Sequence, residues 1–317
     1  MGPRARIALV GAGAMGANHA RVIAESEGAD LAVIIDTDCE RVRPLADRLG
    51  CAVSVDLEAA AACDAAVIAT PTGFHEVAAR ALIDLGKPLL VEKPVTQDLE
   101  TTRAIVACAE RRGVPLMCGF VERYNPVVAA MRNLLDEEPV HIVGLRHSPA
   151  TPRSTLSVVF DLLIHEIDLA LAYMGGARPV HVCGATSTAR RAPIVEVADC
   201  VLRFPGGAVA TLSASRASQR KVRTQLVATG TALYEVDLLR QDLTVYHHRA
   251  HEQGVGPAGG YRAETVIDIP FVRHTGEPLA LQFRHFLDLV DGRADACQER
   301  NSILPAHEVA NAIEESS

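Results

Sequence analysis

Residues 7–16 read Ile-Ala-Leu-Val-Gly-Ala-Gly-Ala-Met-Gly, an apolar run followed directly by the pattern Gly-x-Gly-x-x-Gly. The run predicts a buried strand, and the apolar periodicity of Met15–Ala24 predicts a helix immediately after it. In such a turn Gly11 allows the sharp bend, Gly13 lets a pyrophosphate approach the backbone, and Gly16 lets the helix pack closely on the sheet. The glycines therefore predict a dinucleotide site at the start of a helix.

Asp36 supplies a second feature of such a site. It lies twenty residues after Gly16, at the end of the next predicted strand, Leu31–Ile35. A carboxylate at this position accepts hydrogen bonds from the adenosine ribose hydroxyls and repels a 2′-phosphate. The sequence therefore favours NAD over NADP, although an Asp here also suits the cap of a helix that begins near Glu40.

The first 120 residues alternate short apolar runs with helical patterns. This alternation predicts an α/β fold built from βαβ units, with a doubly wound parallel Rossmann sheet over residues 1–122. The predicted strands are 7–10, 31–35, 65–69, 88–91 and 115–118, and the predicted helices are 15–24, 40–49, 74–85 and 99–112.

The pattern changes after residue 122, and we expect a second domain over residues 123–317. A helix should begin at Asn125-Pro126, with Asn as the cap and Pro in the first turn. From Pro179 to Ile269 the runs rich in Val, Thr and Leu predict strands joined by hairpins, with a glycine-rich loop over His251–Gly260. The domain is therefore expected to be α+β, with a large, open, mostly antiparallel sheet. Closing helices follow, and they are free to pack back on the first domain.

Charged groups interrupt apolar elements at two places. Glu92-Lys93-Pro94 follows the predicted strand 88–91, which puts the lysine at the carboxyl edge of the sheet, where ligands bind. Asp161 and His165 are four residues apart in the predicted helix Val159–Met174, so they share one face of it. A carboxylate beside an imidazole fixes its tautomer and raises its basicity, so Lys93, His165 and Asp161 are the candidate catalytic residues.

Ala69-Thr70-Pro71-Thr72 ends another predicted strand at the same edge. Thr70 and His75 are expected to border the cofactor. The alternative is an ordinary turn followed by the start of a helix.

The glycine pattern, Glu92-Lys93-Pro94 and the Asp161-x-x-x-His165 helix resemble the glucose-fructose oxidoreductase, inositol dehydrogenase and rhizopine-catabolism family. The similarity runs over nearly the whole chain and includes the segments 69–75 and 123–126. It implies an NAD-dependent sugar or cyclitol dehydrogenase in which His165 takes the hydroxyl proton and Lys93 binds the reacting oxygen. Asp161 would support the site by hydrogen bonding, and Glu92 would lie near the nicotinamide ribose.

The predicted site has a cofactor part and a substrate part. The expected cofactor-binding residues are Gly11, Gly13, Ala14, Met15, Gly16, Asp36, Thr70, Pro71, His75, Glu92 and Lys93. The expected substrate-binding residues are Lys93, Arg123, Tyr124, Arg153, Asp161 and His165.

A narrower resemblance, carried by segments 119–126, 146–153 and 158–168, is to the nucleotide-sugar 3-dehydrogenases of this family. It implies oxidation of a secondary hydroxyl at C3 of a sugar, nucleotide-sugar, aminosugar or cyclitol, ahead of transamination in aminosugar or aminoglycoside biosynthesis. Two alternatives stay open. One is a ketosugar reductase that uses NAD(P)H, because the same residues serve both directions. The other is an inactive relative that senses NAD or a sugar.

The polar residues of the second half leave the substrate undetermined. A diphosphate would be held by basic groups and a polycationic aminoglycoside by acidic ones such as Glu122, Asp199 or Glu235. Ordinary solvated surface residues are the alternative for any one of the basic groups. The basic groups considered for a diphosphate are Arg146, Arg153, Arg216, Arg220, Lys221 and Arg223.

Composition restricts the possible partners. The formal charge is −8 over 317 residues, with 4% aromatic residues and no Trp, so no nucleic-acid partner is expected. No run approaches the roughly twenty apolar residues of a membrane helix, and no signal-peptide pattern precedes the first strand, so we expect a cytoplasmic protein with no membrane partner. Eight cysteines without a Cys-x-x-Cys pair predict free thiols and no metal. The family resemblance implies a homodimer or homotetramer formed through the second sheet.

Overall fold

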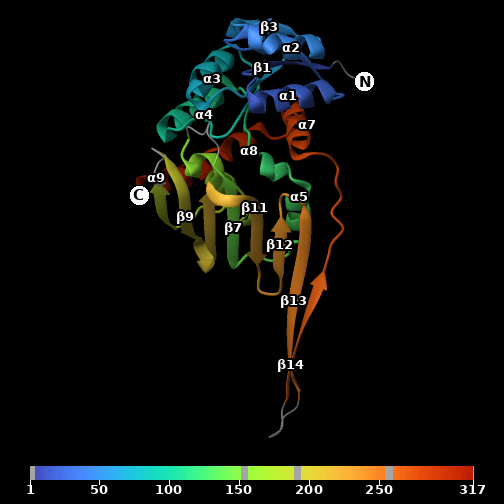
Figure 1. Cartoon of the computed structure of the whole chain (residues 1–317), viewed down its shortest axis with the longest axis vertical. Helices are drawn as coiled ribbons and strands as arrows, with labels where there is room; N and C mark the ends of the chain where they lie inside the picture. The colour runs from blue at the N-terminus through green and yellow to red at the C-terminus, as the bar shows by residue number, and fades with distance from the viewer. Residues whose placement is uncertain (1–3, 151–155, 189–193, 254–259, 317) are drawn as a thin grey trace. The chain divides into compact units, whose positions relative to one another are not determined.

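The computed structural model describes residues 4–150, 156–188, 194–253 and 260–316 and divides the chain into two compact units (Figure 1). The first unit comprises Met1–Tyr124 and Gly276–Asn311. The second comprises Asn125–Thr275 and Ala312–Ser317. The chain therefore returns to the first unit after completing most of the second.

The first unit contains a six-stranded parallel sheet, as the alternation of strands and helices predicts. Across the sheet the order is β3 (Ala52–Ser54), β2 (Ala29–Ile35), β1 (Ala5–Val10), β4 (Ala65–Ile68), β5 (Leu89–Val91) and β6 (Leu116–Cys118). β4 and β5 are apolar and buried throughout, as are residues 7–10 of β1, because helices cover both faces. The strand order reverses between β1 and β4, and ligands of such sheets bind in the crevice at that point.

Helices of the first unit begin and end at residues suited to those positions. Asp38 and Asp98 accept backbone N–H groups as caps of the second and fourth helices, and Gly50 and Gly113 end the same helices in the left-handed conformation. The elements are α1 (Ala14–Glu25), α2 (Cys39–Leu49), α3 (His75–Asp84), α4 (Leu99–Arg112), α7 (Pro278–Val290), α8 (Ala296–Asn301) and α9 (Leu304–Glu315), with 3₁₀ turns η1 (Leu57–Ala62), η2 (Thr72–Phe74) and η3 (Val121–Tyr124). The first unit includes α9 as far as Asn311.

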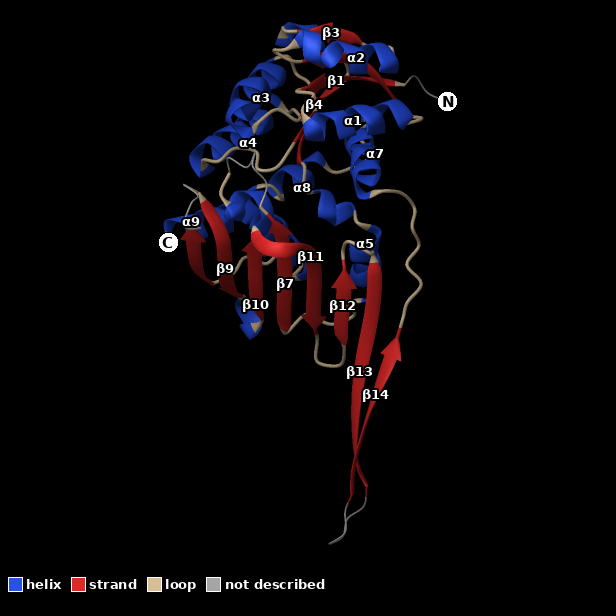
Figure 2. Cartoon of the chain, viewed as in Figure 1, coloured by secondary structure: helices blue, strands red, loops and turns tan. Residues whose placement is uncertain are grey.

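The second unit is built on an eight-stranded sheet, drawn as one continuous layer in Figure 2. Among the described strands of this sheet only β10 and β7 pair in parallel, so the prediction of a mostly antiparallel sheet is confirmed. The order is β14 (Gly260–Asp268), β13 (Asp242–Gln253), β12 (Leu233–Asp237), β11 (Ala217–Ala228), β7 (His141–Pro149), β10 (Val209–Ser215), β9 (Val195–Arg203) and β8 (His181–Thr188).

Helices cover one face of this sheet. α5 (Pro126–Leu134) starts at the predicted Asn125 cap, and α6 (Ile164–Tyr173) follows directly on a π-helical turn, η4 (Val159–Leu163). The residues of β7, β9 and β10 beneath them are buried, while alternate residues on the other face, such as Val201 and Ser213, are partly or fully exposed. The sheet is therefore covered on one side and open on the other.

Three elements differ from the sequence prediction. β3 has three residues and pairs with β2 alone, and α8 buries none of its six residues, so neither has the apolar periodicity on which the prediction depends. The expected loop over 251–260 is shorter, because β13 continues to Gln253 and β14 begins at Gly260 (Figure 1). The rest of that loop, residues 254–259, lies outside the described residues.

Candidate active site

The glycine turn has the geometry that its sequence predicts. Gly11 has a φ of +86°, and a Cβ added there would lie 2.7 Å from Thr70, so both the backbone conformation and the space require glycine. A Cβ at Gly16 would lie 2.0 Å from the carbonyl oxygen of Gly11. A Cβ at Gly13 would meet nothing within 4 Å. Gly11 and Gly16 are therefore needed for packing, whereas Gly13 faces open space, as a phosphate-binding position must.

Helix α1 begins at this turn without a side-chain cap. Gly13 occupies the cap position, and no acidic side chain lies in the first turn, which Ala14 and Met15 begin. The first N–H groups of a helix have no partner within the helix and carry a partial positive charge. This helix end is therefore suited to an anionic group such as a pyrophosphate.

Asp36 is held in place at the end of β2. Its carboxylate accepts hydrogen bonds from the amides of Ala12 (2.9 Å) and Asp38 (3.0 Å) and from the guanidinium of Arg41 (2.8 Å). Burial would raise the pKa of Asp36, but these donors outweigh it, so the pKa lies below its ordinary value. The carboxylate is thus ionised at neutral pH. The alternative interpretation of Asp36 as the cap of the following helix is wrong, because Asp38 caps α2 and accepts the amide of Arg41 at 3.0 Å.

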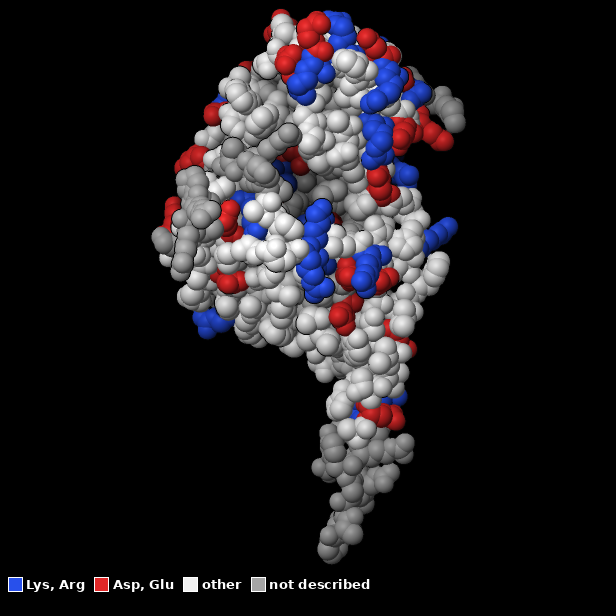
Figure 3. Space-filling view, viewed as in Figure 1, with Lys and Arg blue, Asp and Glu red and all other residues white. Residues whose placement is uncertain are grey.

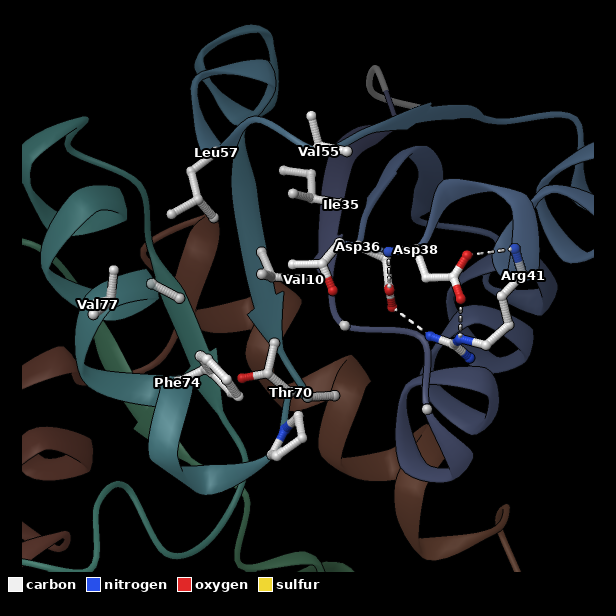
Figure 4. A pocket seen from close by; sticks show the side chains of 16 residues that line it. Val10, Ile35, Asp36, Asp38, Arg41, Val55, Leu57, Thr70, Phe74 and Val77 are labelled. Atoms are coloured by element: carbon white, nitrogen blue, oxygen red, sulfur yellow. Dashed lines mark hydrogen bonds and ion pairs between the residues drawn. The ribbon is translucent and has the colours of Figure 1, made fainter.

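A cavity of about 440 Å³ opens between the ends of β1, β2 and β4. Asp36, Asp38 and Arg41 stand at one side, and Thr70, Phe74 and Val77 at the other (Figure 4). Its walls are otherwise apolar and include the well-exposed side chains of Val55, Phe74 and Val77. An apolar slot with polar groups at one end fits an adenine ring with its ribose.

Thr70 and Pro71 line this cavity, but His75 does not. The hydroxyl oxygen of Thr70 is buried and has no hydrogen-bond partner. His75 is 1% exposed, and its two ring nitrogens face the backbone oxygens of Thr70 (2.9 Å) and Pro94 (3.1 Å). The open space at Gly13, the uncapped helix and the unpartnered Thr70 hydroxyl together fit a bound dinucleotide, whereas His75 contacts backbone only.

Glu92 and Lys93 follow β5 at the same edge of the sheet. Ile68 of β4 is in register with Val91 of β5, so the turn that carries Thr70 and the turn that carries Lys93 lie side by side. Lys93 is half-buried, and Glu92 is 7% exposed.

In the second unit, His165 and Asp161 lie on the helical segment that covers the sheet. His165 is 7% exposed, in the first turn of α6, and Asp161 lies in the π-helical turn before it. Arg216, itself 3% exposed, donates to Asp161 at 2.6 Å and to the carbonyl oxygen of Leu156 at 2.8 Å. Arg216 therefore fixes the Asp161 carboxylate.

The basic residues considered for a diphosphate divide into several groups. Arg146 is 3% exposed and pairs at 2.6 Å with Glu166, whose other oxygen accepts from Gln225 at 2.7 Å. Arg146 and Arg216 are thus both paired with carboxylates, the first with the buried Glu166 and the second with Asp161, whose side chain is 31% exposed. A cation removed from water requires such a partner. The other candidates are Arg220 and Lys221, which are exposed, Arg223, which is half-buried, and Arg153, which lies outside the described residues.

Arg123 and Tyr124 contact the helices that return to the first unit. Arg123 donates to the hydroxyl (2.7 Å) and carbonyl (3.1 Å) oxygens of Ser302, and the Tyr124 ring lies 5.4 Å from that of His285. These contacts hold η3 against α7 and α8.

The sequence analysis missed two buried histidines in the first unit, His19 and His307. Both contact the segment around Lys93: His19 pairs with Glu92, and His307 accepts from the amide of Val95. His19 lies three residues after Gly16 on the apolar face of α1, which was the available signal.

The described residues offer neither a metal site nor a membrane-spanning helix. They contain no group of three or more His, Cys, Asp or Glu side chains arranged to hold a metal ion. None of the helices in the described segments is both long and apolar enough to span a membrane.

Comparison with known proteins identifies the family. Residues 5–120 match the oxidoreductase family with an NAD-binding Rossmann fold, and residues 146–233 match the C-terminal domain of the GFO/IDH/MocA group. The chain is 30% identical to the UDP-N-acetylglucosamine 3-dehydrogenase of Acidithiobacillus ferrooxidans, over 98% of this chain and 97% of that protein. It is 32% identical to an inositol 2-dehydrogenase of Mycolicibacterium smegmatis, over 84% of this chain and 82% of that protein. A solved structure of the Acidithiobacillus enzyme superposes with a TM-score of 0.85 at 27% identity, covering 99% of this chain and 97% of that one. The chain therefore belongs to the GFO/IDH/MocA family of NAD-binding oxidoreductases.

Proposed function

We propose that this protein oxidises a secondary hydroxyl, at C3, of a sugar, with NAD as the hydride acceptor and a nucleotide-linked sugar as the favoured substrate class. The observation that carries the proposal is the position of Lys93, at the carboxyl end of β5 and beside the Thr70 turn that lines the cavity. The relative that acts on UDP-N-acetylglucosamine matches this chain along nearly its whole length, which supports the substrate class and the C3 position. An amine for transfer to the resulting ketone would come from a separate aminotransferase.

The glycine turn, Asp36 and Thr70 would hold NAD, which would accept the hydride that leaves the substrate carbon. The ammonium of Lys93 donates a hydrogen bond to the substrate oxygen and lowers the pKa of the hydroxyl. The neutral imidazole of His165 takes the hydroxyl proton as the carbon–hydrogen bond breaks, leaving a ketone, NADH and a protonated imidazole. Asp161, fixed by Arg216, would orient the site through hydrogen bonding.

We propose NAD as the preferred cofactor because of the charge at Asp36. An ionised carboxylate accepts hydrogen bonds from ribose hydroxyls but repels a 2′-phosphate dianion. Asp36 is ionised at neutral pH for the reasons given above.

The proposal is tested by replacing each catalytic group alone. Lys93→Met and His165→Gln should each lower kcat for NADH formation by about a hundred- to ten-thousandfold, the usual contribution of one such group. The assay uses UDP-sugars, free cyclitols and aminoglycosides as substrates. Binding of NAD, measured by calorimetry, should stay within a few-fold of wild type, because neither change alters the glycine turn or Asp36.

Matched controls are Arg111→Met and His181→Gln, which remove an exposed cationic side chain and an exposed histidine. Both controls should keep the wild-type rate. Wild-type rates in both Lys93→Met and His165→Gln would overturn the mechanism. Turnover of a cyclitol or an aminoglycoside in preference to every UDP-sugar would overturn the substrate class.

A further inference from the structure

Three fully buried histidines from three different helices contact one four-residue turn. His19 of α1, His75 of α3 and His307 of α9 are 0%, 1% and 1% exposed. Each contacts the segment Glu92–Val95, which contains Lys93. We propose that these histidines are positioning residues that together fix the Lys93 turn in the geometry that the reaction requires. This inference rests on the proposed role of Lys93.

His307 holds the backbone amide that follows Pro94. Its Nε2 accepts the N–H of Val95 at 3.1 Å, and its Nδ1 donates to the carbonyl oxygen of Ile303 at 2.8 Å. Burial is the main cause that lowers the pKa of His307 to about 4, so the ring is neutral at pH 7 and can accept at one nitrogen while donating at the other. An apolar side chain at this position would leave the Val95 amide buried without a partner.

His75 connects the same turn to the cofactor cavity. Its Nδ1 lies 3.1 Å from the carbonyl oxygen of Pro94 and 3.2 Å from that of Val95, while its Nε2 lies 2.9 Å from that of Thr70. Thr70 lines the cavity. One ring therefore spans the distance between the cofactor-lining turn and the lysine-bearing turn.

His19 fixes the residue before Lys93. Its Nε2 lies 2.7 Å from Oε1 of Glu92, and Oε2 of Glu92 accepts the backbone N–H of Lys93 at 3.3 Å. A Cβ at Gly119 would lie 2.9 Å from the same Oε2, so glycine at this position leaves room for the carboxylate where it lies. His19 lies three residues after Gly16 on α1, so the helix that begins at the glycine turn also contacts the residue before Lys93.

The three contacts restrain different parts of the turn. His19 restrains the Glu92 side chain, His75 the carbonyl oxygens of Pro94 and Val95, and His307 the amide of Val95. Lys93 itself is half-buried, and its long side chain extends from a backbone that these contacts restrain. A displacement of about 1 Å at a catalytic group can cost on the order of a hundredfold in rate, so a rigid turn has direct value for the reaction.

Asparagine and glutamine variants separate a positioning role from a purely structural one. The side-chain amide of Asn reaches about as far as Nδ1 of His, and that of Gln about as far as Nε2. At His19 and His307 the contact to the turn is made by Nε2, so Gln keeps it and Asn loses it. At His75 the contact to the turn is made by Nδ1, so Asn keeps it and Gln loses it.

We therefore expect a crossed result. His19→Asn, His307→Asn and His75→Gln should lower kcat at saturating NAD and substrate by about ten- to a hundredfold. His19→Gln, His307→Gln and His75→Asn should stay within about threefold of wild type. NAD affinity should change less than kcat in all six variants. Gln282→Leu, which removes another fully buried polar side chain that contacts no residue of this turn by hydrogen bond, is the control and should keep kcat.

A second readout does not depend on activity. Reductive methylation of Lys93, followed by peptide mass spectrometry across pH, reports the exposure and basicity of its amine. The three kcat-lowering variants should shift this profile, and the other three should not. The contradicting result is that kcat and the labelling profile follow only the melting temperature, and that His75→Gln is no slower than His75→Asn. The histidines would then be structural, and the positioning role would be wrong. If Lys93→Met is fully active while labelling still separates the two sets of histidine variants, the proposed function is wrong. The inference that the three histidines fix the Lys93 turn would remain.

Discussion

Asp36 and Arg41 form an ion pair beside the cavity, and from this pair we expect a discrimination between NAD and NADP. The Arg41 side chain is about half exposed, whereas that of Asp36 is 7% exposed. Arg41 also donates to the carbonyl oxygen of Ala12 at 3.0 Å, so its guanidinium lies against the glycine turn. Loss of the Asp36 carboxylate would leave this guanidinium free to bind a phosphate, for which its fork of N–H groups is suited.

Asp36→Ser should therefore weaken NAD binding and strengthen NADP binding. We expect the ratio of the two dissociation constants to change by at least about tenfold, which corresponds to roughly 1.4 kcal/mol. Titration calorimetry with each cofactor measures both constants. In the double variant Asp36→Ser/Arg41→Ala the gain in NADP affinity should disappear.

Glu40→Ser is the matched control, because Glu40 lies next to Arg41 on α2 and its side chain is 86% exposed. It should leave both constants unchanged. A wild-type protein that binds NADP more tightly than NAD would contradict the assignment of Asp36.

At the scale of elements, α7 and α8 are tied together by a histidine–glutamate pair. Nε2 of His285 lies 2.8 Å from Oε1 of Glu299. The hydrogen bond with Glu299 is the largest cause that raises the pKa of His285, and it outweighs the opposing effect of burial. A folded-state pKa above the unfolded value means that the pair stabilises the fold fully below about pH 6.5 and loses its contribution as pH rises through the folded pKa.

Glu299→Gln should therefore lower the free energy of unfolding near pH 6 by roughly 1 kcal/mol, a value between those of exposed and buried charged pairs. The loss should shrink as pH rises toward 9. Urea unfolding at several pH values measures it. Glu100→Gln, which breaks the exposed pair with Arg103, should show no such pH dependence, and the same loss at every pH in Glu299→Gln would contradict the assignment.

The elements that the sequence predicts well are those whose information is local. The glycine turn, the strand before it and the position of Lys93 after β5 follow from patterns within about ten residues. The histidine contacts around Lys93 do not follow from local patterns, because His19 and Glu92 are 73 residues apart and Val95 and His307 are 212 residues apart. Their pairing depends on how α1 and α9 pack on the sheet, which residue types alone do not reveal. The burial of Arg146 was unpredictable for the same reason, since its partner Glu166 lies on a different element.

At the scale of the whole molecule, the second unit leaves one face of its sheet in water. Tyr234 of β12 is buried and donates to the carbonyl oxygen of Leu134 in α5, on the side that α5 and α6 cover. On the other side Val201 of β9 is 41% exposed, and at the edge strand β14 Ile267 is 57% exposed. In Figure 3, acidic and basic side chains are interspersed over the surface of the first unit, where no single charge dominates the visible face.

Exposed apolar side chains on a broad sheet face are typical of an interface between protein chains, so we expect the protein to form a homodimer or homotetramer through this sheet. Light scattering should then give a mass of two or four chains. Val201→Lys places a charge on the open face and should weaken the association by at least about tenfold, because a buried unpaired charge is costly. Leu134→Lys, a substitution of a 43% exposed residue on the helix-covered side, should leave the mass unchanged. A monomeric wild type would contradict the oligomer, and an unchanged mass for Val201→Lys at every concentration would show that the chains associate through a different surface.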